Sequence, residues 1–445
     1  MGGSPMPTTL RRLNARLYVW RRSLLRYKVT VMGLLLTCFG AATALGNPHV
    51  VISVAAATAG IVVSTLEVYS NRRRSKTVRF QRRKADDYRD LLRDAQADGR
   101  VIRTPSDVGI LMVEETSLIR RKDVPASMDE VPFVVHSDLE RYSIIFLARR
   151  LRRSVLFNGR ALGLSSDIPR SGDRPVALRP VRYFDFVATN LLSPNDVYEV
   201  GRQEPVLRGR DLIFNSRGEM RRFQNSRLAN TVGVSTLAFT KDGKLLLVCQ
   251  TVDVAGSPGL IAPSGSGALE PRDMSGAVSS TLQEIVLAGA HRELREECNI
   301  VESDIEEGAE VIGFGRWVSR GAMPEFCAVT LLTKSADEIL KKRVRRGERI
   351  YVGDVMAVRL PAIDDWSAIT GLELLGDKAH RHAVSWPLGL ALTCLVQVMR
   401  DPSWQLRKRL LERLDSDSPT RSVGVGGRDQ DGTSAHPDSR PSPGA

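Results

Sequence analysis

The first hydrophobic pattern along the chain is a pair of uncharged apolar segments, Val29–Leu45 and Val50–Leu66. Each has 17 residues, which is the lower end of the length that a helix needs to cross a bilayer. The Gly-Asn-Pro between them is a turn signal, so the pattern predicts an antiparallel hairpin of two transmembrane helices. Two alternatives stay open: a buried helical hairpin in a soluble protein, and a signal peptide that is cleaved after Ala44.

The segments that flank this hairpin are strongly basic. Residues 1–28 and 72–84 together contain fifteen Lys and Arg and no acid, whereas the net charge of the whole chain is +13. Because basic flanks mark the cytoplasmic side of a membrane, both termini are predicted to be cytoplasmic in a multi-pass protein. The rest of the chain is close to neutral, which argues against binding of duplex nucleic acid. Leucines at helical spacing within residues 1–28 fit an amphipathic helix on an anionic leaflet, or equally a solvated basic arm.

Beyond the hairpin, the pattern becomes that of a folded mixed protein. The apolar runs Val234–Thr240 and Lys244–Val252 flank Lys241-Asp242-Gly243, which predicts a β-hairpin. A glycine loop, a helix, three strands and two late helices follow. The predicted organisation is a basic amphipathic segment (1–28), two transmembrane helices (29–45 and 50–66), a basic juxtamembrane linker and helix (72–100), an α+β region (101–225), an α/β domain (226–415) and a disordered tail (416–445).

The cysteines give no sign of a metal or disulfide framework. All five stand singly, without the paired spacing of a zinc site. They are expected to be small buried apolar residues in a reducing compartment.

One predicted helix, within Glu284–Ile300, carries a cluster of acids. Glu293, Glu296 and Glu297 share one helix face, because residues three and four apart are neighbours there. Crowded carboxylates of this kind destabilise a helix unless a cation neutralises them. Hard oxygen ligands suit Mg²⁺ or Mn²⁺, so we predict a site for one of these ions. The alternative is a charged surface face with no ligand.

Two further features support this helix as a site. Arg292 is predicted to reach back about two turns to Glu284 and so to fix the helix. Just upstream, Gly265, Ser266 and Gly267 form a glycine loop whose backbone can approach a phosphate or a metal.

These residues carry a resemblance to the Nudix family, whose box reads Gly-x5-Glu-x7-Arg-Glu-U-x-Glu-Glu-x-Gly-U, where U is aliphatic. The positions that match in register are Glu284, Arg292, Glu293, Leu294, Glu296, Glu297 and Ile300. Asn299 replaces the last glycine and is expected to be tolerated there, since asparagine adopts the left-handed conformation readily. The first glycine lies too early: Gly267-Ala-Leu-Glu270-Pro resembles its surroundings, but Arg272–Gln283 then intervenes as an insertion.

The resemblance implies a fold, a metal and a chemistry. The fold class it implies is an α/β (α+β) Nudix-like sandwich of a mixed sheet between helices, here with a preceding α+β region and the transmembrane hairpin. Glu293, Glu296 and Glu297 would hold Mg²⁺ (or Mn²⁺) for hydrolysis of a nucleoside diphosphate linked to another group. The expected ligand-binding residues are Gly265, Ser266, Gly267, Glu270 and Glu325. Glu325 is otherwise a plain turn residue.

The hairpin and the box together resemble the two-transmembrane Nudix effectors of bacterial cyclic-oligonucleotide antiphage signalling (CBASS). That resemblance implies a protein of the bacterial inner membrane that binds a cyclic oligonucleotide, assembles as a homo-oligomer and disrupts the membrane. The alternative is a membrane-tethered, Mg²⁺-dependent Nudix pyrophosphohydrolase. The intact carboxylates favour the enzyme, whereas the overall architecture favours the effector, so whether the protein is an enzyme stays open.

Overall fold

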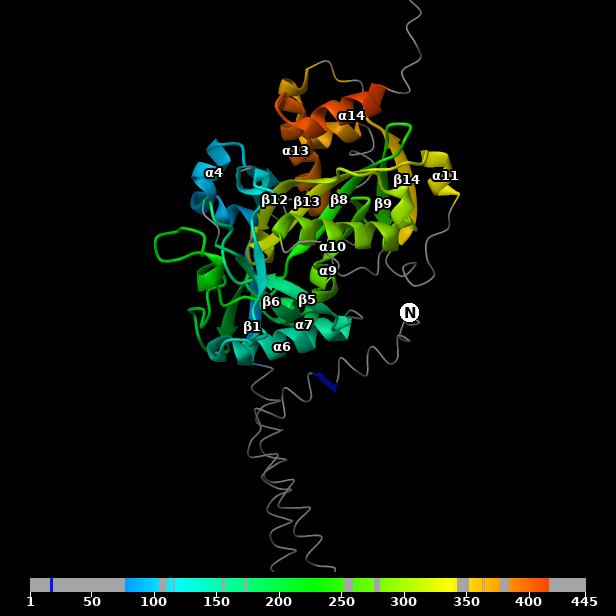
Figure 1. Ribbon diagram of the computed structural model, residues 1–445. Coiled ribbons are helices and arrows are strands. Elements are labelled where there is room, and N and C mark those ends of the chain that lie inside the picture. The colour runs from blue at the N-terminus through cyan, green and yellow to red at the C-terminus, as the bar shows by residue number, and fades with distance from the viewer. Residues whose placement is uncertain are drawn as a thin grey trace, which may run out of the picture.

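The structure, a computed structural model, describes residues 17–18, 77–103, 110–114, 117–153, 157–171, 174–251, 259–275, 281–341, 352–361, 363, 365–376 and 384–415. Within these ranges the chain forms a mixed α/β fold with three sheets (Figure 1).

The largest sheet has the strand order β10-β9-β8-β13-β12-β3-β2, with β11 paired to β8 and β14 paired to β9. β8 and β13 run parallel, and the other described pairs of this sheet are antiparallel. Its strands are β2 (Val101–Arg103), β3 (Ile110–Val113), β8 (Gly233–Phe239), β9 (Lys244–Gln250), β10 (Ile261–Ala262), β11 (Gly265–Ala268), β12 (Glu310–Trp317), β13 (Met323–Leu331) and β14 (Val352–Arg359).

The predicted hairpin around Lys241-Asp242-Gly243 is confirmed, since it joins β8 to β9. Gly243 has φ +69°, which is the left-handed conformation that a tight turn requires. Every residue of β8 is buried. A strand covered on both faces is expected to be largely apolar; the polar side chains of β8, Ser235 and Thr236, are hydrogen-bonded, Ser235 to the carbonyl of Phe326 and Thr236 to Thr330.

Helices cover both faces of this sheet (Figure 1). On one face lies α10 (Leu282–Glu297), and Phe326 of β13 packs with it in one apolar core. On the other face lies α13 (Trp386–Arg400), and Cys327, the next residue of β13, packs with that helix. Successive side chains of β13 therefore point alternately into two apolar cores, one on each face of the sheet. The predicted mixed sheet between helices is present.

The second and third sheets are smaller. The second has the order β4-β6-β5, and the third pairs β1 with β7. Their strands are β1 (Val78–Arg82), β4 (Ala126–Met128), β5 (Arg160–Leu164), β6 (Val176–Arg182) and β7 (Asn195–Glu199). The remaining helices are α4 (Arg93–Ala97), α5 (Ser117–Arg120), α6 (Ser137–Arg153), α7 (Tyr183–Ala188), α8 (Arg210–Ile213), α9 (Pro271–Ser275), α11 (Ala336–Leu340) and α14 (Gln405–Asp415). The 3-10 helices are η1 (Ala85–Tyr88), η2 (Asp90–Leu92), η3 (Phe223–Asn225), η4 (Glu302–Asp304), η5 (Val318–Arg320), η7 (Trp366–Ala368) and η8 (Gly371–Leu375).

The region predicted as a separate α+β unit is joined to the large sheet. β3 pairs with β12, and β2 pairs with β3, so Val101–Arg103 and Ile110–Val113 extend the sheet at one edge. β5 also contacts the domain that follows it, because the N–H of Leu162 donates to the carbonyl of Leu269 over 2.8 Å.

The predicted transmembrane hairpin is not supported, and the fold class and location are corrected accordingly. Among the described residues, no helix has both the length and the apolar character needed to span a bilayer. The apolar helix α13 has 15 residues and buries its apolar side chains against the sheet. We therefore withdraw both the hairpin and the multi-pass placement in the inner membrane. The segments Val29–Leu45 and Val50–Leu66 lie outside the described residues.

Candidate functional site

The acidic helix α10 begins and ends at residues suited to those places. Thr281 is its N-cap, and the Thr281 side chain accepts a hydrogen bond from the N–H of Glu284. Past its last turn, Asn299 has φ +53°, so the predicted left-handed role of this asparagine is confirmed. The chain can then leave the helix toward η4.

Gly265, Ser266 and Gly267, predicted as a glycine loop, belong instead to the strand β11, which lies directly against the last turn of α10. The Ser266 N–H donates to Glu297 Oε2 over 3.1 Å. A Cβ added to Gly265 would lie 2.4 Å from the backbone nitrogen of Leu294. A Cβ added to Gly267 would lie 2.1 Å from Glu293 Oε1. The structure therefore places Gly265, Ser266 and Gly267 beside the predicted glutamates. A side chain at Gly265 would collide with the helix backbone, and one at Gly267 with the Glu293 carboxylate.

Arg292 holds α10 to the segment that follows β11. Its guanidinium donates to both carboxylate oxygens of Asp273, from Nε over 2.8 Å and from Nη2 over 3.0 Å. Nη2 also donates to the carbonyl of Ala268 over 2.8 Å. Arg292 and Asp273 are 6% and 4% exposed. Burial alone would lower the pKa of Arg292, but the bonds to Asp273 and the charge of Glu293 raise it above its ordinary value.

Asp273, and not Glu284, is the partner of Arg292. Glu284 instead lies at the start of α10, where its carboxylate accepts a hydrogen bond from the Thr281 hydroxyl over 2.9 Å. Asp273 was missed, although a signal for it exists. It stands six residues after Gly267, the position at which the Nudix box has its first acid, so the extra residues follow that acid instead of preceding it.

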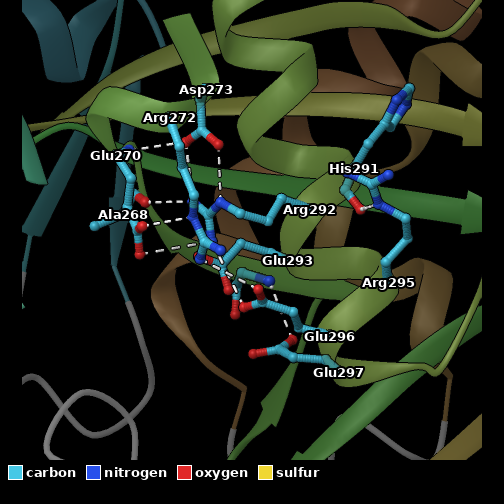
Figure 2. A network of polar contacts seen from close by, with 11 residues as sticks. Ala268, Glu270, Arg272, Asp273, His291, Arg292, Glu293, Arg295, Glu296 and Glu297 are labelled. Atoms are coloured by element: carbon cyan, nitrogen blue, oxygen red, sulfur yellow. Dashed lines mark hydrogen bonds and ion pairs between the residues drawn. The ribbon is translucent and has the colours of Figure 1, made fainter. Parts of the chain in front are cut away.

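Four carboxylates gather beside this clamp, and we call Glu270, Glu293, Glu296 and Glu297 the acidic site (Figure 2). Glu293 accepts from Arg292 Nη1 over 2.6 Å, and Glu296 Oε2 lies 3.7 Å from the same nitrogen. A second guanidinium, from Arg272 of α9, lies 2.7 Å from Glu270 and 3.2 Å from Glu296. Glu270, Glu293 and Glu296 are thus paired with two arginines.

Glu293 has a strongly raised pKa. Burial raises the pKa of its carboxyl to about 7, against the opposing charge of Arg292, and the neighbouring Glu296 and Glu270 raise it further. A cation placed among these groups would favour their ionised forms.

The acidic site fits a hard divalent cation in its donor chemistry. All of its side-chain donors are carboxylate oxygens, and Gly267 leaves the space that the Glu293 carboxylate occupies. Among the described residues, however, no group of three His, Cys, Asp or Glu is already arranged to hold a metal ion. In Figure 2, Arg272 and Arg292 point into the carboxylates.

Glu325 lies elsewhere. Glu325, in β13, pairs with Gly233 of β8 and Gly315 of β12. A Cβ added to Gly315 would lie 3.1 Å from Leu390 of α13. Glu325 therefore faces the α13 side of the sheet, whereas the acidic site belongs to the α10 side. The structure does not bring this predicted ligand-binding residue to the glutamates.

Burial gives Glu325 an unusual titration. It is 3% exposed, and burial raises the pKa of its carboxyl from 4.5 to about 8, with Arg320 acting in the opposite direction. In the unfolded chain the carboxyl ionises near its ordinary value, so between about pH 4.5 and pH 8 only the folded state holds this proton. The stability that the Glu325 carboxyl contributes must therefore fall as pH rises through this window.

We expect Glu325→Gln to flatten this dependence. Gln resembles the protonated carboxyl and does not titrate, so the variant should match the wild type only below about pH 4.5, and its advantage over the wild type should grow by roughly 2 kcal/mol between pH 6 and pH 8. Urea unfolding at the two pH values measures the difference. Glu338→Gln is the control, because the hydrogen bonds from Ser335 lower the pKa of Glu338 and leave it ionised over this range. Equal pH slopes in the wild type and Glu325→Gln would contradict the assignment.

Comparison with known proteins adds little to this geometry. No protein-family model and no curated protein matches the chain. Among solved structures, the protein DR0079 from Deinococcus radiodurans is similar over 42% of this chain and 95% of its own, with 15% sequence identity and a TM-score of 0.25. A TM-score this low carries no conclusion about fold or function.

Proposed function

We propose that this protein is a Nudix-like hydrolase that uses a divalent cation, Mg²⁺ or Mn²⁺, to cleave a nucleoside diphosphate linked to another group. The observation that carries the proposal is that the residues of the box lie together in space, although an inserted segment separates them in the sequence. Gly267 leaves space for Glu293, and Arg292 is clamped to Asp273, which stands at the position of the box's first acid. A charged surface helix with no ligand would need neither the glycine nor the buried clamp.

The chain's own groups have separate roles in this proposal. Glu293, Glu296 and Glu297 would hold the cation, which would neutralise charge on the phosphate oxygens during attack by water. The Ser266 N–H orients Glu297, since it donates to Oε2 of that carboxylate. Arg292 and Asp273 fix the position of α10 along β11 and so hold the three carboxylates beside Gly265–Gly267.

A second candidate is a receptor that binds a nucleotide, such as a cyclic oligonucleotide, without cleaving it. The specific observation in its favour is that Arg272 and Arg292 already neutralise Glu270, Glu293 and Glu296. The Arg272 side chain, which is 56% exposed, could turn from these carboxylates to a phosphate of the ligand without a metal. A cyclic oligonucleotide joined only by phosphodiesters also offers no pyrophosphate to cleave.

The test is to incubate the full chain with a panel of nucleoside diphosphate conjugates and cyclic oligonucleotides, with Mg²⁺ or with EDTA, and to separate the products chromatographically. We expect Mg²⁺-dependent cleavage of at least one conjugate. Glu296→Gln and Glu297→Gln should each lower turnover about 100-fold, because a lost ligand removes charge stabilisation in the transition state.

Glu302→Gln is the matched control for these variants. Glu302 lies just beyond the same helix and pairs with Arg295, away from the acidic site, so turnover should be unchanged. Tight binding of a cyclic oligonucleotide without any cleavage would favour the receptor instead. The absence of both cleavage and binding would reject both candidates.

A further inference from the structure

We propose that Arg272 is a built-in counter-cation that competes with the divalent cation for Glu270 and Glu296 and so sets the metal affinity of the acidic site. This inference rests on the proposed function, because it concerns the same carboxylates. It adds a residue that the Nudix box does not contain, from a helix that leads into the inserted segment.

The two arginines at the acidic site differ in how they are held. The Arg292 side chain is 7% exposed and is fixed by Asp273 and by the carbonyl of Ala268. The Arg272 side chain is 56% exposed, and its ion pairs go to Glu270 over 2.7 Å and to Glu296 over 3.2 Å. Arg292 is therefore part of the framework, whereas Arg272 can leave by rotation of its side chain into solvent.

Arg272 contacts carboxylates that the divalent cation would also contact, so the two cations compete for them. Glu270 lies between β11 and α9, Glu296 lies in the last turn of α10, and the Arg272 guanidinium bridges the two. A divalent cation that binds Glu296 competes with Arg272, because two positive charges at one carboxylate repel each other. The free energy needed to displace the guanidinium weakens the binding of the metal by the same amount.

The expected size follows from the exposure of the pair. Ion pairs at exposed sites contribute little individually, so releasing Arg272 should weaken metal binding by a modest factor. We expect Arg272→Gln to bind Mn²⁺ roughly 3- to 10-fold more tightly than the wild type. Gln keeps a polar side chain of moderate length but removes the positive charge.

The experiment measures Mn²⁺ binding to the full chain directly, by the electron paramagnetic resonance signal of free Mn²⁺ at fixed pH and ionic strength, without substrate or turnover. Arg295→Gln is the control. Arg295 is on the same helix as Glu296 but pairs with Glu302, so its loss should leave Mn²⁺ affinity unchanged. In a Glu296→Gln background the gain from Arg272→Gln should shrink, because the shared carboxylate is gone.

The outcomes separate this inference from the proposed function. Mn²⁺ binding in the wild type that is weakened by Glu296→Gln but not tightened by Arg272→Gln would overturn the role of Arg272 alone. Weaker binding in Arg272→Gln would overturn it as well. No Mn²⁺ binding to the wild type or to Arg272→Gln would reject the cation site and, with it, both proposals.

Discussion

Asp273→Ala is expected to lower the free energy of unfolding by about 3–5 kcal/mol, whereas Glu284→Ala should cost about 1 kcal/mol or less. The large loss follows from burial. The Arg292 guanidinium is 93% buried on its side chain and bonds Asp273 through two nitrogens, so removal of Asp273 leaves a buried cation with one partner fewer. Breaking one side of a buried ion pair is destabilising by this order.

The variants differ because the two acids make different contacts. Asp273 also accepts a hydrogen bond from the N–H of Glu270 over 2.8 Å, so it orders the turn that leads into α9. Glu284 lies in the first turn of α10 and contacts the N-cap Thr281, where a capping acid contributes a fraction of a kcal/mol to about 1 kcal/mol.

Urea unfolding followed by far-ultraviolet circular dichroism measures both losses. The double variant Asp273→Leu with Arg292→Met provides a further check. It should recover part of the stability lost in Asp273→Ala, because an apolar pair leaves no buried charge. Comparable losses in Asp273→Ala and Glu284→Ala would show that Glu284 shares the clamp and would contradict the assignment.

The features predicted correctly from the sequence are local ones. Gly243 and Asn299 were identified from turn and helix-end chemistry, and both adopt left-handed conformations in the structure. The acidic helix was also predicted correctly, but the predicted glycine loop is itself the strand β11, which leads to α10 through α9. Such features depend on a few neighbouring residues, so the sequence reports them directly.

The features that were missed depend on contacts between distant segments. Glu284 and Arg292 are eight residues apart on one helix, a separation of about 12 Å along its axis, which is too long for a buried pair. α9 instead folds back and supplies Asp273. Likewise, only the pairing of β13 with its neighbours reveals that Glu325 faces α13. Nor could spacing show that Arg272 bridges two of the carboxylates.

Gly265 and Gly267 of β11 give the second large expected effect, a separation of stability from ligand binding by two neighbouring alanine substitutions. Gly265→Ala should lower the free energy of unfolding by about 3 kcal/mol. Its added Cβ would lie 2.4 Å from the nitrogen and 2.6 Å from the Cα of Leu294, both of which are backbone atoms of α10. Because no side chain can rotate away, the helix itself must move from the sheet, which has the cost of a strongly overpacked core.

Gly267→Ala should behave differently, although it is only two residues away. The three atoms nearest its added Cβ, at 2.1 to 2.6 Å, all belong to the carboxyl group of Glu293. That group is the end of a flexible side chain and can move, so the stability loss should be about 1 kcal/mol or less. The displaced carboxylate is a proposed cation ligand, so Mn²⁺ affinity should fall about 10-fold in this variant.

Gly159→Ala is the matched control for both substitutions. Its added Cβ would meet the Phe157 ring at 3.5 Å, which is an ordinary contact, so stability and Mn²⁺ affinity should stay close to those of the wild type. Thermal unfolding and Mn²⁺ titration of the three variants complete the comparison. If Gly267→Ala bound Mn²⁺ as tightly as the wild type, Glu293 would not be a cation ligand. If Gly265→Ala were as stable as Gly159→Ala, α10 would not lie against β11 as closely as the structure places it.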